Sequence, residues 1–111
     1  MNIHTTQVDY ITAVAVKGRV DSVSSDGLGD RLGGLIRCDS PRLAINLKDV
    51  DYISSTGLRV LLIAARAVEQ AGGRMVLCGM PKEIQRLFDI AGFSELFTIL
   101  PTQDEAIRAL R

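Results

Sequence analysis

The chain has 111 residues, a length that predicts a single domain spanning residues 1–111. Lys and Arg together number 13, as do Asp and Glu, so the basic surplus of a nucleic-acid-binding protein is absent. No apolar stretch approaches the ~18 residues of a membrane span, and residues 1–5 lack the character of a signal peptide. We therefore expect a cytoplasmic protein that binds neither nucleic acid nor a membrane.

Cysteine and histidine content gives no support for a metal or redox site. Cys38 and Cys78 lie far apart without metal-like spacing, and His4 is the single histidine. We expect both thiols to be reduced and buried, and we expect no cofactor.

The first elements in chain order are two strands and a helix. The opening residues alternate loosely as in a strand, and residues 11–17 predict a second strand that a turn over 18–22 ends. Apolar positions at helical spacing then predict a helix over 25–38. Its four glycines each cost up to about 1 kcal/mol relative to alanine, so we expect this helix to be the most mobile element.

The middle of the chain predicts a buried strand and a long helix. Pro41 closes the preceding helix, and residues 42–47 form a near-continuous apolar run that is typical of a central strand. Residues 48–53 read as a connection. The helix predicted over 56–71 ends at a Gly-Gly pair, in the usual manner of a helix C-terminus.

The last third alternates strands and helices. Strands are predicted over 74–78 and 96–100, and helices over 82–91 and 102–110, with Thr102 as the N-cap of the last helix. The resulting order, ββαβαβαβα, predicts an α/β layer fold with parallel crossovers.

Two groups of residues invite a chemical interpretation that the spacing does not support. The run from Gly27 to Leu32 has Leu32 where a dinucleotide-binding loop needs a third glycine, and no phosphate-loop lysine follows it. Asp21, Asp49 and Asp51 could converge as a metal or acid-base site, but Asp is so common in turns that capping or solvation is favoured. We expect no catalytic residues.

Three consecutive hydroxyl residues precede the long helix. Ser54, Ser55 and Thr56 are favoured N-cap types, and one of them is expected to cap the helix. Gly57 lacks a Cβ, so we expect it to leave the first turn open to a partner. An exposed hydroxyl at a helix start is also a kinase target, because backbone amides and the helix dipole tolerate a phosphate there.

The same helix separates apolar from basic residues. At 100° per residue its inward face comprises Leu58, Leu61, Ala64, Ala65 and Val68. On the outer side Ile63 lies between Arg59 and Arg66, either as an incidental exposed residue or as an apolar anchor with basic neighbours. If an acidic partner docks there, a phosphate at Ser55 would repel it, and losing about 2.7 kcal/mol would weaken binding about a hundredfold.

Residues 46–62 resemble the signature of the STAS domain, in particular that of stand-alone bacterial anti-sigma factor antagonists of the SpoIIAA/RsbV type. Residues 18–21, 72–78 and 86–93 agree, so the resemblance covers essentially the whole chain. It implies a single STAS-like domain with a mixed, mostly parallel sheet of about four or five strands and about four helices.

The family pattern at the turn is Asp-Ser-Ser/Thr-Gly-Leu, in which the first serine accepts the phosphate. Aligned on Gly57, the resemblance implies phosphorylation of Ser55, with Ser54 and Thr56 as less favoured acceptors. Ser54 stands where the family usually has an acidic residue, and Asp21 matches the acidic residue in the neighbouring loop. The partner-binding residues expected are Asp21, Ser54, Ser55, Thr56, Gly57, Arg59, Ile63 and Arg66.

The resemblance also implies that the protein works by partner switching. We expect a monomer, because the interaction surface is needed for a heterologous partner. The unphosphorylated protein would bind a serine-kinase anti-sigma factor with a histidine-kinase-like ATPase fold and so free the sigma factor. The kinase would then phosphorylate the antagonist, and a PP2C-type phosphatase would reverse this. The alternative is a non-phosphorylated STAS subunit of a larger complex, such as a lipid-transport ABC system, in which the same helix docks constitutively.

Overall fold

Five strands form one sheet in which the order in space follows the order in the chain. The computed structural model describes residues 1–111. The strands are β1 (Asn2–Val8), β2 (Ile11–Val20), β3 (Arg42–Ile53), β4 (Arg74–Cys78) and β5 (Thr98–Leu100). β1 runs antiparallel to β2, and all other neighbours are parallel. The mixed, mostly parallel sheet predicted from the sequence is confirmed.

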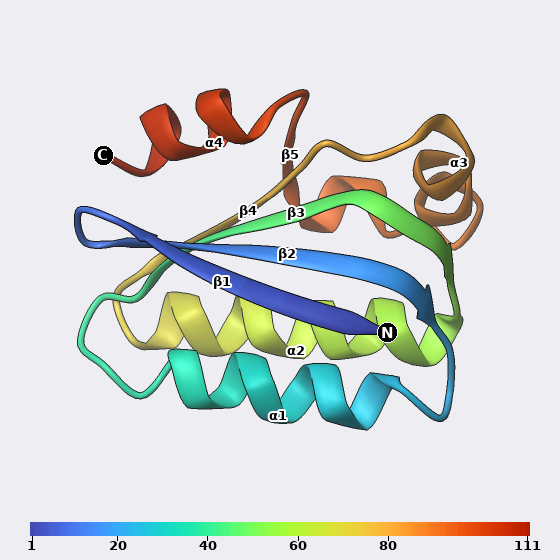
Figure 1. Ribbon diagram of the computed structural model, residues 1–111, viewed down its shortest axis with the longest axis horizontal. Coiled ribbons are helices and arrows are strands. Elements are labelled where there is room, and N and C mark those ends of the chain that lie inside the picture. The colour runs from blue at the N-terminus through green and yellow to red at the C-terminus, as the bar shows by residue number, and fades with distance from the viewer.

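Helices cover both faces of the sheet (Figure 1). They are α1 (Ser25–Leu35), α2 (Ser55–Gln70), α3 (Lys82–Ile90) and α4 (Gln103–Leu110), with a 3-10 turn at Ser94–Leu96. α1 and α2 lie side by side and parallel beneath the sheet, whereas α4 lies on the opposite face. The predicted element order is confirmed, and Thr102 caps α4 by accepting a hydrogen bond from the backbone N–H of Glu105 at 3.2 Å.

The two faces of the sheet carry separate hydrophobic clusters. The larger cluster has 18 buried residues and joins the sheet to α1, α2 and α3. The smaller has seven and lies under α4. In β3, Leu43 and Ile45 face the larger cluster and Ala44 faces the smaller, which explains why this strand is apolar on both sides.

Two strands are longer than the sequence predicts. β2 continues to Val20, although a turn was predicted over 18–22; Gly18 takes a left-handed φ of +97°, and the pairing register shifts beside it. β3 continues to Ile53, although 48–53 read as a connection, because Val50 and Ile53 are buried in the larger cluster. The extra length brings both strands up to the start of α2.

The expectation that both cysteines are buried is wrong for one of them. α1 ends at Leu35, three residues before the predicted end, so Cys38 lies in the following loop and is exposed. Cys78 is buried under α4, and burial raises the pKa of its thiol to about 11.

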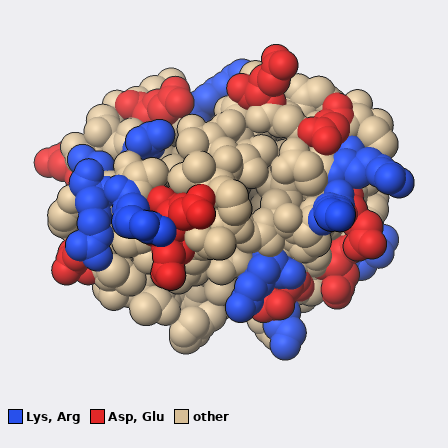
Figure 2. Space-filling view, turned by 90° about the horizontal axis from the view of Figure 1, so that it is seen from above, with Lys and Arg blue, Asp and Glu red and all other residues tan.

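The surface carries charges of both signs. On the face that bears α4, Lys and Arg alternate with Asp and Glu around the rim, and the centre is uncharged (Figure 2). None of the helices combines the length and the apolar character that crossing a bilayer would require.

Candidate functional site

Ser54 takes part in three hydrogen bonds that hold the turn between β3 and α2. Ser54 Oγ accepts from the backbone N–H of Gly57 at 3.1 Å, so Ser54 is the N-cap that the hydroxyl run predicted. Its carbonyl oxygen accepts from the N–H of Leu58 at 2.9 Å, and its own N–H donates to the carbonyl oxygen of Val20 at 2.8 Å. The start of α2 is therefore fixed to the end of β2.

Two further hydroxyl residues, Ser55 and Thr56, follow Ser54. Ser55 and Thr56 are exposed, and neither side chain makes a hydrogen bond within the protein. Because Ser54 already uses its oxygen as the cap, Ser55 and Thr56 are the hydroxyls free to react or to bind.

Gly57 does not leave the first turn open, contrary to the interpretation of the sequence. It is buried, and a Cβ there would lie 2.8 Å from Val20 Cγ1 and 2.9 Å from Ile53 Cγ1. Glycine is needed at this position because the first turn of α2 packs closely against the ends of β2 and β3. A partner at this end of α2 would reach Ser55 and Thr56 rather than Gly57.

Asp21 lies in the loop that follows β2, one residue beyond the Val20 carbonyl that holds Ser54. Its Oδ1 accepts from the backbone N–H groups of Val23 and Ser24, each at 3.0 Å. The pKa of Asp21 is lowered, chiefly by the hydrogen bond from the Ser24 backbone N–H. Partial desolvation acts in the opposite direction and raises the pKa. The Val23 backbone N–H, the Ser24 hydroxyl and the Arg19 charge lower it further. The carboxylate thus rigidifies this loop and remains ionised beside the turn.

A contact between Arg19 and Tyr52, which the sequence did not predict, completes this end of the sheet. They are paired in the β2–β3 register, and the Arg19 guanidinium lies over the Tyr52 ring, 4.3 Å from its centre. Arg19 Nε also lies 3.5 Å from Asp21 Oδ2. Their proximity depends on strand register across the bulged end of β2, so only the register could have revealed it.

The outer side of α2 carries the residues that the helical periodicity placed there. Arg59 and Arg66 are exposed, and Ile63 between them is 60% exposed. The inward face is confirmed, with Leu58, Leu61, Ala64 and Val68 buried and Ala65 half-buried. The structure thus places Asp21 and the Ser54–Thr56 turn at one end of α2, and Arg59, Ile63 and Arg66 along its exposed side.

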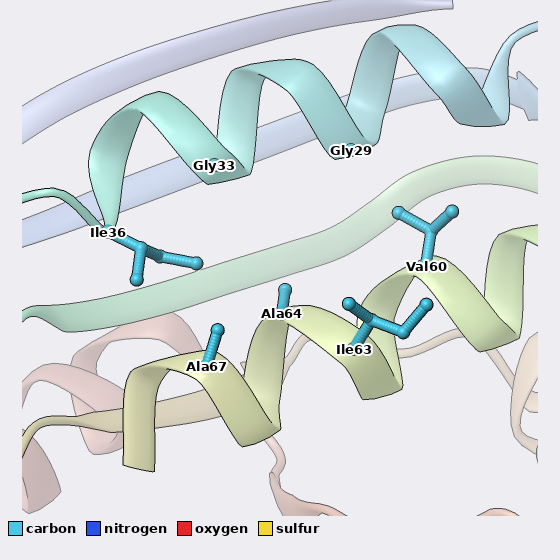
Figure 3. Close-up of a pocket in the computed structure, with 7 residues that line it drawn as sticks. All are labelled: Gly29, Gly33, Ile36, Val60, Ile63, Ala64 and Ala67. Atoms are coloured by element: carbon cyan, nitrogen blue, oxygen red, sulfur yellow. The ribbon is translucent and has the colours of Figure 1, made fainter. Parts of the chain in front are cut away.

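An apolar hollow runs between α1 and α2, and we call it the α1–α2 groove. It is lined by Gly29, Gly33, Ile36, Val60, Ile63, Ala64 and Ala67 (Figure 3). No group of three or more His, Cys, Asp or Glu side chains is arranged to hold a metal ion. The surface around α2 offers exposed hydroxyls, unpaired arginines and an apolar groove, which are means of binding a protein.

Comparison with known proteins identifies the family. A model of the STAS domain matches residues 2–106. The anti-sigma-B factor antagonist of Bacillus subtilis is 32% identical over 99 residues, which are 89% of this chain and 90% of that protein. Among solved structures, an anti-sigma factor antagonist from Mycobacterium paratuberculosis has a TM-score of 0.89 at 24% identity, covering 99% of this chain and 93% of that one.

A further solved structure is that of Bacillus SpoIIAA in its phosphorylated form. It has a TM-score of 0.72 at 18% identity and covers 99% of this chain and 100% of that chain. The family model spans nearly all of the described residues, and the fold agrees with both structures. The resemblance found in the sequence is confirmed, and the chain belongs to the STAS domain family.

Proposed function

We propose that this protein is an anti-sigma factor antagonist that acts by partner switching in the cytoplasm. In the unphosphorylated state it binds a serine-kinase anti-sigma factor with a histidine-kinase-like ATPase fold and releases the sigma factor. The kinase transfers the γ-phosphoryl group of ATP to the Ser55 hydroxyl, with ADP as the other product, and binding is lost. A PP2C-type phosphatase hydrolyses the phosphoserine and restores binding.

The observation that carries the proposal is a structural difference between the adjacent residues Ser54 and Ser55. Ser54 caps α2 through its Oγ, whereas Ser55 is exposed and makes no side-chain hydrogen bond. A kinase can therefore modify Ser55 without removing the cap. The replacement of the family's acidic residue by Ser54 preserves capping, because Ser and Asp are comparable N-caps.

A phosphate on Ser55 would act through charge rather than through refolding. It adds about −1.5 to −2 charges at a helix N-terminus, where the free amides and the helix dipole stabilise it. The turn itself stays held by the bond between the Ser54 N–H and the Val20 carbonyl. What changes is the potential of the surface that includes Asp21, Ser54, Thr56, Arg59, Ile63 and Arg66.

Relatives support the proposal in two ways. The related proteins are named anti-sigma factor antagonists, and a structure of similar fold is of a phosphorylated form of SpoIIAA. Ser54 stands where the family usually has an acidic residue, so phosphorylation needs a test separate from binding. The alternative function, a STAS subunit of a constitutive complex such as a lipid-transport ABC system, would need no phosphate.

The test uses a purified serine-kinase anti-sigma factor with a histidine-kinase-like ATPase fold and ATP. We expect ATP to yield one phosphate, which peptide mass spectrometry locates at Ser55, and Ser55→Ala to remain unmodified while still binding. Ser55→Asp should weaken binding about a hundredfold by calorimetry, which corresponds to about 2.7 kcal/mol. Thr98→Ala, which removes an exposed hydroxyl on β5 away from this surface, is the control and should bind and be phosphorylated normally. Normal binding by Ser55→Asp, or phosphate on Thr56 alone, would contradict the proposal.

A further inference from the structure

The α1–α2 groove is an apolar surface that the fold leaves uncovered. Gly29 and Gly33 of α1 and the C-cap residue Ile36 line one side, and Val60, Ile63 and Ala67 of α2 line the other (Figure 3). A methyl group at Gly29 would contact Val60 Cγ1 at 3.5 Å, whereas one at Gly33 would meet no atom within 4 Å. The space between the helices therefore opens from Gly29 toward Gly33.

The size of the groove suits side chains better than a small molecule. Its volume is about 210 Å³, which is below the roughly 300–1,000 Å³ of typical small-molecule sites. From Gly29 to Ile36, at about 1.5 Å per residue, the groove runs for roughly 10 Å, or two helical turns. That length accommodates apolar anchors at positions i, i+3 or i+4, and i+7 of a docked helix.

The lining favours a helix over an extended peptide. Five of the seven lining residues are apolar, the other two are glycines, and the flanking backbone belongs to helices whose amides and carbonyls bond internally. An extended segment would find no backbone partners there, and unmade hydrogen bonds are costly away from water. A helix brings its own hydrogen bonds and needs only apolar contact.

Charges of opposite sign flank the two sides of the groove. On α2, Arg59 and Arg66 lie one helical turn from Ile63, and on α1, Asp26 and Asp30 lie three residues before Gly29 and Gly33. All four are exposed, and none belongs to either of the two ion pairs in the protein. They remain free for an amphipathic helix with acidic residues toward α2 and basic residues toward α1.

We propose that the α1–α2 groove receives an amphipathic helix of the anti-sigma partner, with its apolar face between the helices and its acidic edge against Arg59 and Arg66. This inference rests on the proposed function and adds a second contact to it. Ser55 controls binding at the start of α2, and the groove provides apolar affinity along its length. Ile63, 60% exposed at the edge of the groove, is its main anchor.

The chain supplies matched variants for the test. Gly33→Leu fills the groove, whereas Gly34→Leu places the same side chain on the same helix outside it; no atom lies within 4 Å of a Cβ at either position. Ile63→Ala removes the anchor, and Ile90→Ala removes an isoleucine on α3 that is 76% exposed and lies outside the groove. Circular dichroism checks that each variant is folded.

Calorimetry with the purified anti-sigma kinase should show at least tenfold weaker binding for Gly33→Leu and Ile63→Ala, and unchanged binding for Gly34→Leu and Ile90→Ala. Exchanging the charge in Arg66→Glu should also weaken binding, and an acidic-to-basic change in the partner helix should restore it.

Unchanged binding by both groove variants would overturn the inference, while loss of binding by Ser55→Asp would leave the proposed function standing. The inference also fails if sedimentation shows a wild-type dimer that Gly33→Leu dissociates, because the groove would then hold a second copy. An apolar small molecule that co-purifies with the wild type and is absent from Gly33→Leu would overturn it as well. If the wild type binds no such kinase, the proposed function falls and the inference falls with it.

Discussion

The side-chain oxygen of Ser54 accepts a hydrogen bond from the backbone N–H of Gly57 at 3.1 Å and thereby caps α2. Removing this oxygen in Ser54→Ala should lower the free energy of unfolding by about 1 kcal/mol. Ser54→Asp should retain the stability of the wild type, because a carboxylate caps as well as a hydroxyl does. Urea denaturation measures both. Ser55→Ala, which removes an exposed hydroxyl without a bond, serves as the control and should change stability by less than about 0.5 kcal/mol. Equal loss in Ser54→Ala and Ser55→Ala would show that the cap contributes nothing.

Gly57→Ala should destabilise the protein although alanine is the better helix former. The added methyl would lie 2.8 Å from Val20 Cγ1 and 3.3 Å from the Val20 carbonyl oxygen, which β2 holds in place. Such overpacking costs about 1–3 kcal/mol. Gly34→Ala is the matched control, because its methyl meets no atom within 4 Å and should stabilise α1 by up to about 1 kcal/mol. Thermal unfolding of the pair should give shifts of opposite sign, and a stabilised Gly57→Ala would contradict the packing.

Asp21 should make the stability of the protein depend on pH in the acid range. Because hydrogen bonding, chiefly from the Ser24 backbone, lowers its folded-state pKa, the ionised carboxylate stabilises the fold above the unfolded value of about 3.9. This contribution is lost as the pH falls through the folded-state pKa. Asp21→Asn should therefore flatten the pH dependence of the free energy of unfolding in that window, and an unchanged pH dependence in this variant would contradict the role of Asp21.

The origin of the Asp21 shift can be tested by salt. Hydrogen bonds contribute more to it than the neighbouring Arg19 does. Its pKa, followed by NMR, should stay low at about 1 M salt, where interactions between exposed charges are screened. Recovery of an ordinary carboxyl pKa in salt would instead assign the shift to Arg19.

The two thiols should differ sharply in reactivity. Cys38 is exposed, whereas Cys78 is buried under α4 with its thiol pKa raised to about 11. A thiol reagent at neutral pH should label Cys38 rapidly and Cys78 only after denaturant is added, because the thiolate is the reactive form. Cys38→Ser should abolish the rapid phase, and rapid labelling of that variant would mean that α4 does not protect Cys78.

The features that the sequence predicted correctly are those that depend on short segments of the chain. The element order, the cap of α4 by Thr102 and the inward face of α2 follow from periodicity and from favoured residue types, both of which are visible in short segments. The hydroxyl run identified the start of α2, although it did not distinguish the capping serine from the free one.

The remaining features depend on contacts between distant segments. Residues 48–52 are mostly exposed and polar, and β3 continues through them because it pairs with β2 and buries Val50 and Ile53. Glycine carries no hydrophobic signal, which is why Gly57 could not be assigned to the interior. The α1–α2 groove likewise depends on the separation of two helices.

The order of the strands bears on how the protein folds. Each strand of the sheet lies beside the one that precedes it in the chain, so no strand has to enter between two that have already paired. The sheet can grow from the β1–β2 hairpin by adding one crossover unit at a time, and each step closes a loop of moderate length. The turn that carries Ser55 belongs to the first such unit, because Ser54 bonds to the Val20 carbonyl of β2 and to the N–H groups of Gly57 and Leu58 in α2, and none of these bonds involves β4 or β5.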